Sequence, residues 1–262
     1  MPPLFTRALQ AGAALAMLAA AAAAAPAALA QSPALTDPQK KAVEQIVRDY
    51  LIANPEIIQE AVAELERRQQ EQQKTAQKSA LQTERATLLQ SPRGNVVGNV
   101  SGDVTLVEFF DYNCGYCKRA LTDLRALMKS DPKLRVVLKD FPVLGPDSVE
   151  ASRVGLAAKQ QISGDKLFDY HIKVMETRGR VNGERATAVA KEMGLDMARL
   201  QKDLEHPEVR AALQENMELG DKLGLTGTPA FVIGEEVISG AVGLDPLRKI
   251  VASTRQCGKA VC

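Results

Sequence analysis

The pattern of apolar and polar positions predicts a helical segment at residues 31–92. Thr36-Asp37-Pro38-Gln39 has the form of a capping box with an early proline, which marks a helix start. Apolar residues then recur at helical spacing up to Leu51, and Asn54-Pro55 ends this helix and begins another. From Glu66 to Gln90 the chain is polar, without Gly or Pro, and predicts a long helix with a thin apolar stripe.

Such helices cannot bury their apolar stripe by themselves. The apolar residues of the first two predicted helices that need covering include Ile46, Val47, Ile57, Ile58 and Leu65. Two interpretations stay open, because an amphipathic pattern does not name its partner: the helices pack on their own domain, or they contact further copies of the chain.

From residue 93 onward the pattern alternates between short apolar runs and helical periodicity. Gly94–Asp103 predicts a turn-rich boundary, and the almost continuous apolar run Val104–Phe110 is typical of a central strand. The pattern then predicts a helix at about 114–128, a strand at 134–138, helical segments at about 146–223, strands at 229–233 and 237–239, and a helix at 244–254. The order β-α-β, helical block, β-β-α predicts an α/β domain over residues 93–262.

The first thirty residues have the layout of a secretory signal peptide. Arg7 is their only charged residue, Ala11–Ala25 is a run of small apolar residues, and Ala28-Leu29-Ala30 fits a cleavage site before Gln31. An uncleaved anchor fits less well, because a membrane span needs roughly 20 strongly apolar residues. We therefore expect export.

Composition narrows the classes of partner. The chain has 33 Lys and Arg against 32 Asp and Glu, so nothing predicts a nucleic-acid or anionic-membrane partner, which would need a basic excess. Only two His residues occur, which argues against a His-rich metal site. All four cysteines follow the predicted signal peptide, so they would meet a compartment where disulfides persist.

Cys114-Gly115-Tyr116-Cys117 falls where the apolar run gives way to a helix. Unpaired backbone N–H groups and the helix dipole stabilise an anion there, so we expect Cys114, at an exposed first turn, to have a lowered pKa and to be a thiolate. A thiolate attacks disulfides, and Cys117, one turn deeper, would release the product. Zinc would need ligands as distant as Cys257 and Cys262, and a structural disulfide would close too small a loop. The pair therefore predicts electron exchange, with neither metal nor cofactor.

Residues from about Asp103 to Thr254 resemble the thioredoxin fold in its DsbA-like form. The resemblance rests on the order of features: a strand, C-x-x-C at a helix start, a helical insertion, and Thr228-Pro229 before a strand. The resemblance implies a cis bond at Thr228-Pro229, which leaves the backbone at Thr228 free to pair with an extended substrate beside Cys114. It also implies that Tyr116 contacts substrate. The alternative is an ordinary proline at a strand edge.

Glu108 interrupts the apolar strand upstream of Cys114. The resemblance implies that this carboxyl group lies beneath the active site, has a pKa raised by burial, and relays a proton to or from the buried cysteine. Alternatively it faces solvent. We expect Lys139 to pair with Glu108, and His171 and His206 to be ordinary surface or hydrogen-bonded residues.

The Gly-Tyr dipeptide between the cysteines departs from the Pro-His of strongly oxidising DsbA proteins. Together with Thr before the proline, it is similar to the DsbC-type isomerases. Residues 46–73 resemble the N-terminal region of ScsC-like proteins, which are periplasmic DsbA-fold proteins, some of them trimers, linked to copper tolerance.

The resemblance implies a periplasmic thiol:disulfide interchange protein that reduces or isomerises disulfides in exported proteins. Its partners would be exported proteins with free thiols or wrong disulfides, a membrane redox partner, and further copies of the chain in a homo-oligomer such as a trimer. A DsbA-type dithiol oxidase, a Cu(I)-binding protein with two thiolate ligands, and a chaperone-like module remain alternatives.

Cys257 and Cys262, near the end of the sequence, would close a second, structural disulfide in an oxidising compartment. Free thiols or a redox-linked tail are the other interpretations.

Overall fold

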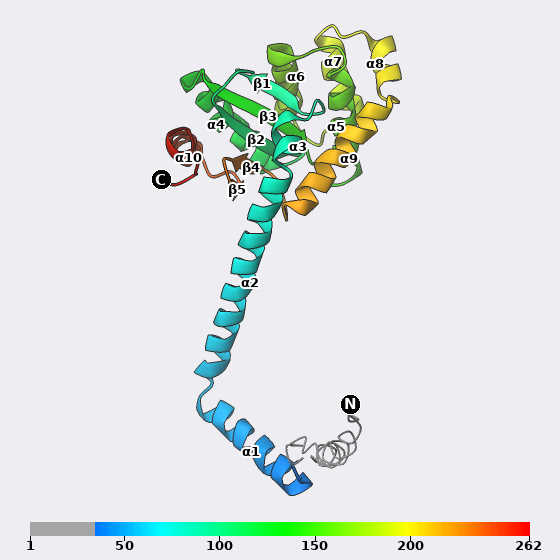
Figure 1. Ribbon diagram of the computed structural model, residues 1–262. Helices are drawn as coiled ribbons and strands as arrows, with labels where there is room; N and C mark the ends of the chain where they lie inside the picture. The colour runs from blue at the N-terminus through cyan, green and yellow to red at the C-terminus, as the bar shows by residue number, and fades with distance from the viewer. Residues whose placement is uncertain (1–34) are drawn as a thin grey trace, which may run out of the picture. The chain divides into compact units, whose positions relative to one another are not determined.

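The computed structural model describes residues 35–262, so the predicted signal peptide lies outside the described residues. The chain divides into two units, one ending at Glu64 and one running from Leu65 to Cys262. Helix α1 (Asp37–Ala53) belongs to the first unit, and helix α2 (Glu56–Thr83) passes from the first into the second (Figure 1).

The first unit begins as the sequence predicts. The Thr36 backbone N–H donates to Gln39 Oε1 at 2.9 Å, and Asn54 follows the last residue of α1. No residue of α1 is buried. Several large apolar side chains of this unit are about half exposed or more, whereas Leu51 and Ile57 are partly buried. We call the following exposed set the N-terminal apolar stripe: Val43, Ile46, Val47, Tyr50, Ile58 and Val62.

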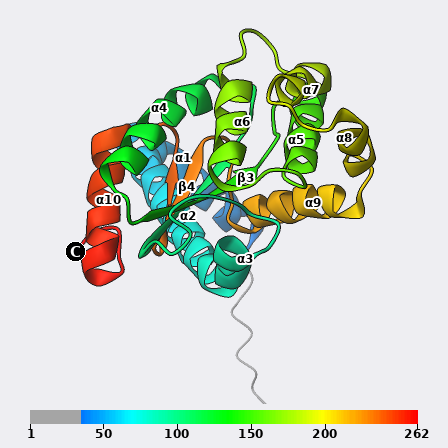
Figure 2. The ribbon, with the colours of Figure 1, turned by 90° about the horizontal axis from the view of Figure 1, so that it is seen from above.

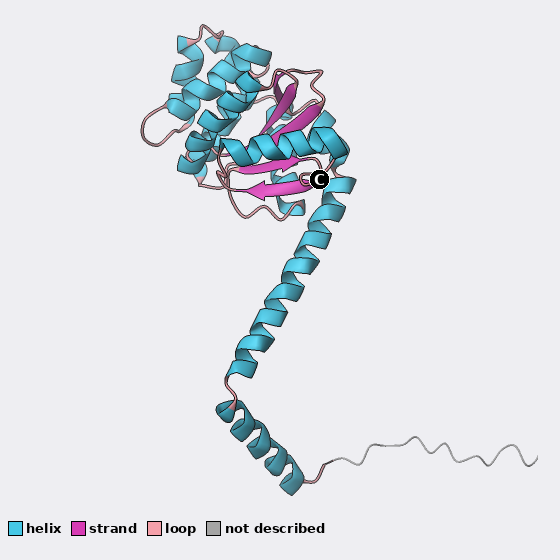
Figure 3. Ribbon diagram, turned by 90° about the vertical axis from the view of Figure 1, so that its left-hand side faces the viewer, coloured by secondary structure: helices cyan, strands magenta, loops and turns pink. Residues whose placement is uncertain are grey.

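The second unit contains a mixed five-stranded sheet of order β1-β3-β2-β4-β5, coloured magenta in Figure 3. The strands are β1 (Asn95–Gly98), β2 (Val104–Phe110), β3 (Leu134–Asp140), β4 (Ala230–Ile233) and β5 (Glu236–Ser239). Strands β2 and β3 are parallel and are joined by helix α4 (Gly115–Ser130), whereas the other neighbouring strands are antiparallel. The β2–α4 junction, which carries the cysteine pair, therefore lies at the carboxyl end of a central strand.

Strand β1 corrects the sequence prediction, which made Gly94–Asp103 a boundary without a strand. Four residues are too few to show a periodicity, so the pattern contains no signal for this strand. Its formation depends on β3, whose Val136 is in register with Val97, and Val97 is completely buried.

Helices cover both faces of the sheet, because successive side chains of a strand point to opposite faces. Besides α2 and α4 they are α3 (Arg85–Gln90), α5 (Pro146–Ala158), α6 (Gly164–Glu176), α7 (Gly183–Glu192), α8 (Met197–Asp203), α9 (Pro207–Lys222) and α10 (Leu244–Cys257). Leu106 and Phe110 of β2 share a core with α4, α6 and α10, whereas Val107 and Phe109 share the other core with α3, α9 and the end of α2 (Figure 2). Helices α5 to α9 form the helical insertion between β3 and β4.

Among residues 35–262, no helix combines the length and the apolar character that a bilayer crossing requires.

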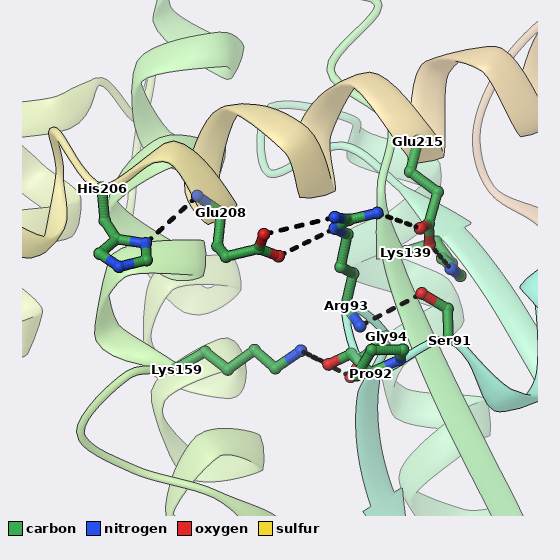
Figure 4. A network of polar contacts seen from close by, with 9 residues as sticks. All are labelled: Ser91, Pro92, Arg93, Gly94, Lys139, Lys159, His206, Glu208 and Glu215. Carbon is green, nitrogen blue, oxygen red and sulfur yellow. Dashed lines mark hydrogen bonds and ion pairs between the residues drawn. The ribbon is translucent and has the colours of Figure 1, made fainter.

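A buried ion pair connects β3 to α9. The Lys139 side chain is fully buried, and its Nζ donates to Glu215 Oε1 at 3.0 Å and to the Thr87 carbonyl at 3.3 Å. Glu215 also accepts from Arg93 at 3.2 Å, and Arg93 reaches Glu208 at 2.9 Å (Figure 4). Burial lowers the pKa of Lys139, and the Glu215 carboxylate opposes that shift. The group thus fastens α3 and the start of β1 to α9.

We predict that Glu215→Gln destabilises the protein by about 3–5 kcal/mol, because it leaves the Lys139 ammonium buried without its carboxylate. The double variant Lys139→Met/Glu215→Gln should recover much of this loss, since it removes both charges. Urea unfolding of the full chain measures the difference. Glu176→Gln, which breaks the exposed Arg125–Glu176 pair, is the matched control and should cost less than about 1 kcal/mol. Equal costs for the two single variants would contradict the prediction.

Candidate active site

The β2–α4 junction places Cys114 and Cys117 at different depths. Cys114 is the N-cap of α4, with extended backbone at φ −79° and ψ 115°, and its carbonyl accepts the first helical hydrogen bond from Lys118 N–H at 3.1 Å. Cys117 lies one turn later and is fully buried in the core. A three-residue separation on a helix therefore gives one cysteine at the tip and one beneath it.

Asp111 and Asn113 hold this junction, and the sequence analysis missed them. Asp111 Oδ1 accepts from Asn113 N–H at 2.8 Å, and Oδ2 accepts from Leu144 N–H at 3.0 Å. The Asn113 side chain bonds to both the N–H and the carbonyl of Val181, at 2.7 and 2.8 Å. Polar residues directly before the C-x-x-C motif were the available signal, because short polar side chains commonly fix turns.

The surroundings of Cys114 stabilise its thiolate. Hydrogen bonding from the Cys117 thiol is the largest cause that lowers the pKa of Cys114, to about 5. The Thr228 side chain and the backbone N–H groups of Tyr116 and Cys117 lower it further, against the opposing effect of burial. The lowered pKa agrees with the sequence prediction, but the predicted exposure was wrong: Cys114 is only 6% exposed. The loop before β4 covers it.

Cys117 has the opposite electrostatic setting. Burial raises its pKa far above the ordinary range of a thiol, and its hydrogen bond to Cys114 and the charge of Glu108 raise it further. Two thiols of identical chemistry thus differ in protonation, with Cys114 ionised and Cys117 protonated at neutral pH.

Thr228 and Pro229 lie directly against Cys114. The peptide bond between them is cis, and Cys114 Sγ lies 3.2 Å from the Thr228 carbonyl oxygen. The buried Thr228 Oγ1 has no hydrogen-bond partner among the described residues, so its hydroxyl is available to a charged sulfur. Tyr116 is 61% exposed beside the cysteines, and the Arg119 guanidinium lies 4.7 Å from its ring centre.

Glu108 is buried within β2, at 1% exposure, on the same face of the sheet as Leu138 and Phe231. Burial, with the charge of Cys114 as the smaller cause, raises the pKa of Glu108 to about 8. Its Oε2 has no hydrogen-bond partner among residues 35–262. The solvent-facing alternative is therefore excluded, and the carboxyl group can hold or give up a proton near neutral pH.

The predicted pairing of Glu108 with Lys139 was wrong. Lys139 is in register with Phe109, so its side chain shares the Phe109 face of the sheet, whereas Glu108 points to the opposite face. Lys139 binds Glu215 instead.

The two histidines differ from each other. His206 is exposed, and its Nδ1 caps α9 by accepting from Glu208 N–H at 3.2 Å. His171 was wrongly expected to be a surface or hydrogen-bonded residue: it is 3% exposed, its ring lies against Phe110 at 4.5 Å between centres, and its Nδ1 has no partner within the described chain. Burial lowers the pKa of His171 to about 3, so the ring is neutral.

Cys257 and Cys262 are joined by a disulfide in the structure, whereas Cys114 and Cys117 are free thiols.

Comparison with known proteins agrees with the fold. A DSBA-like thioredoxin domain model matches residues 105–252, and the model of the copper resistance protein ScsC N-terminal domain matches residues 39–72. A thioredoxin-like oxidoreductase from Silicibacter pomeroyi DSS-3 is 41% identical over 66% of this chain and 98% of its own, with a TM-score of 0.63.

Two further solved structures are similar. A linker-deletion mutant of Proteus mirabilis ScsC is 30% identical, covering 86% of this chain and 98% of its own, with a TM-score of 0.63. The thiol-disulfide exchange protein alpha-DsbA2 from Wolbachia pipientis is 26% identical over 69% of this chain and 96% of its own, with a TM-score of 0.64.

The first curated relatives are longer proteins. The Na(+)/H(+) antiporter NhaA 1 of Salinispora arenicola is 24% identical over 62% of this chain, and the match spans only 24% of the antiporter. The chain thus corresponds to about a quarter of the length of these relatives. The domain match, which extends over more than half of the chain, assigns it to a family: this protein belongs to the DsbA-like thioredoxin family of thiol:disulfide oxidoreductases and carries an N-terminal segment of the ScsC type.

Proposed function

We propose that this protein is a periplasmic thiol:disulfide interchange enzyme that reduces or isomerises disulfides in exported proteins through Cys114 and Cys117. The observation that carries the proposal is the position of Cys114 at the tip of α4, 3.2 Å from the Thr228 carbonyl oxygen, with Cys117 buried beneath it. The lowered pKa of Cys114 and the raised pKa of Cys117 agree with this arrangement. A nucleophile and a resolving thiol are thus present in the states that exchange requires.

The reaction begins when the Cys114 thiolate attacks one sulfur of a substrate disulfide. A Cys114–substrate bond forms, the substrate S–S bond breaks, and the released sulfur takes a proton. In isomerisation another substrate thiolate attacks the mixed disulfide and returns Cys114 unchanged. In reduction Cys117 loses its proton, attacks Cys114, and releases the reduced substrate with two electrons. Glu108, with its pKa near 8, is the group we propose to accept that proton.

Substrate binding is assigned to the surface around Cys114. The Thr228 backbone next to the cis bond would pair with an extended polypeptide, and the exposed Tyr116 ring would contact substrate side chains. Backbone pairing suits an enzyme that acts on many exported sequences, because it reads no particular side chain.

Assembly through residues 31–92 supports the isomerase role. The N-terminal apolar stripe is exposed in the described chain, and exposed apolar surface favours association. A homo-oligomer such as a trimer would surround one misfolded protein with several Cys114 thiolates. The proposal also includes export and a membrane redox partner that keeps the site reduced. It places the domain limits at residues 30 and 92.

A DsbA-type oxidase is the second candidate. The low pKa of Cys114 favours it, because stabilising the thiolate of the reduced form makes the disulfide form a stronger oxidant.

Alkylation of Cys114 by iodoacetamide should follow its thiolate fraction. We predict a constant rate above about pH 6 and a roughly tenfold fall per pH unit below 5, because only the thiolate reacts. A free thiol would instead show its midpoint near pH 8.5. Because the folded-state pKa is the lower one, ionised Cys114 stabilises the reduced protein above about pH 8.5, and this contribution is lost as the pH falls through 5. A midpoint near 8.5 would contradict the assignment.

Refolding of a scrambled-disulfide substrate should require Cys114. We predict that Cys114→Ser loses the activity almost completely, since a hydroxyl is not ionised at neutral pH. Recovery of substrate activity measures it. The Cys257→Ser/Cys262→Ser variant is the control, because it also replaces cysteine by serine but leaves the β2–α4 junction intact. Equal activity of Cys114→Ser and the wild type would exclude this mechanism, and activity only in oxidising a reduced substrate would favour the oxidase.

Charge on the N-terminal apolar stripe should break the assembly. We predict that Ile46→Glu converts an oligomer into a monomer, because a carboxylate cannot be buried without a partner. Light scattering gives the molar mass. Lys41→Glu, which changes α1 at an exposed position outside the stripe, should leave the mass unchanged. A monomeric wild type would contradict the proposed assembly.

A further inference from the structure

The second cysteine pair is accessible and lies away from the active site. Cys257 is the last residue of α10, and a disulfide joins it to Cys262. Both residues are exposed, so an attacking sulfur can reach them, whereas the active-site cysteines are buried.

The tail disulfide and Cys114 lie toward opposite ends of strand β2. Arg255, two residues before Cys257, binds Asp103 at 2.9 Å and Asp131 at 2.8 Å, and these carboxylates precede β2 and follow α4. Cys114, by contrast, follows the end of β2.

Helix α10 runs between these two ends of the strand. Its first residues follow Gly240, whose N–H donates to the Pro229 carbonyl at 2.8 Å beside the active site. A helix of 14 residues is about 21 Å long. The length of α10 therefore separates the tail disulfide from the loop beside Cys114 in the same chain, so exchange between the two pairs takes place between two copies.

The two pairs also occupy opposite ends of helices, which sets a direction for electrons. Cys114 caps the N-terminus of α4, where N–H groups and the dipole stabilise a thiolate, whereas Cys257 ends α10, where the carbonyls destabilise one. Lys259 is the single basic residue between the tail cysteines, and it is exposed and solvated. The pair with the better stabilised thiolate is the stronger oxidant as a disulfide. Electrons should therefore pass from the tail dithiol to the active-site disulfide.

We propose that Cys257 and Cys262 are a substrate of the protein's own active site, which oxidises them in a second copy of the chain. The proposal rests on the proposed thiol exchange at Cys114 and adds a specific substrate for it.

The step balances with the active-site disulfide as oxidant. A tail thiolate attacks Cys114 Sγ, the Cys114–Cys117 bond breaks, and Cys117 takes a proton. The second tail thiolate then attacks the tail sulfur of the mixed disulfide and releases Cys114 as a thiolate. Two electrons reach the active site, one tail proton is transferred to Cys117, and the other goes to solvent.

Closing the tail also shapes a surface. Ala260, inside the loop, is 4% exposed, and the loop lines a cavity of about 450 Å³ together with the end of α2 and the β4–β5 turn. Oxidation would therefore hold the tail against Leu81 of α2, which is itself buried.

Two full-length variants separate the two pairs. The oxidant is oxidised Cys257→Ser/Cys262→Ser protein, which has only the active-site pair. The substrate is reduced Cys114→Ala/Cys117→Ala protein, in which Ala replaces the cysteines because a buried free cysteine behaves as a small apolar residue. After mixing in equal amounts, thiols are alkylated at intervals and counted in each chain by mass. We expect the tail disulfide to form at least tenfold faster than with oxidised glutathione at the same concentration, with one active-site dithiol appearing per disulfide formed.

A synthetic peptide with two cysteines serves as the control substrate. If the oxidant oxidises this peptide but not the tail, the inference is overturned while the proposed exchange activity stands. If it oxidises neither, the inference is overturned, and the refolding of a scrambled-disulfide substrate decides the proposed function separately. A second measurement uses reduced Cys117→Ser protein with the oxidised-tail variant: a mixed disulfide between Cys114 and Cys257 or Cys262 supports the inference, and linkage only between the tail cysteines of the two chains, or no linkage, contradicts it.

Discussion

The structure depends on a negative charge held on sulfur at the boundary between a strand and a helix. Cys114 has this position because β2 ends in the centre of the sheet and α4 begins five residues later. The helix N-terminus provides N–H groups, and the Thr228 side chain in the loop before β4 lowers the pKa of Cys114 further. Each contribution is modest, but they add at one atom because Asp111 and Asn113 fix the junction through four hydrogen bonds.

Burial then separates the roles of groups that would otherwise titrate together. Cys114 is stabilised as an anion by its hydrogen-bond donors. Burial outweighs the hydrogen bonds that lower the pKa of Cys117, and burial is the main cause that raises the pKa of Glu108, so both groups keep their protons to higher pH. Differences in burial and hydrogen bonding thus give one site a nucleophile, a resolving thiol and a carboxyl group whose pKa is near neutral. For the two cysteine pairs, the difference lies in the helix ends: the N-terminus of α4 stabilises a thiolate, whereas the C-terminus of α10 destabilises one.

The two units have different relations to solvent. The second unit, from Leu65 to Cys262, contains both cores of the sheet. Within it the buried Lys139 is paired with Glu215, whereas Glu108 Oε2 and His171 Nδ1 have no hydrogen-bond partner among the described residues. The first unit buries none of α1 and leaves Ile46 67% exposed. Amphipathic helices of this kind gain most of their stability by packing against a further surface, and this unit contains most of the segment that matches the ScsC N-terminal domain.

The sequence by itself determined the elements that carry the chemistry. The almost continuous apolar run Val104–Phe110 is typical of a central strand, and a C-x-x-C motif at the following helix start places one sulfur at the tip and the other a turn deeper. The Thr-Pro before β4 marked the partner loop because proline restricts the backbone in a way that a sequence reveals. These features follow from local periodicity and from the fixed geometry of single residues.

The tertiary structure decided what depends on neighbours that are distant in the sequence. Strand β1 exists because β3 provides its hydrogen bonds, and Lys139 binds Glu215 because strand register turns it away from Glu108. The burial of Cys114 likewise comes from a loop more than a hundred residues later. Side-chain facing and long-range contacts are set by how the elements pack, and local patterns contain no record of that packing.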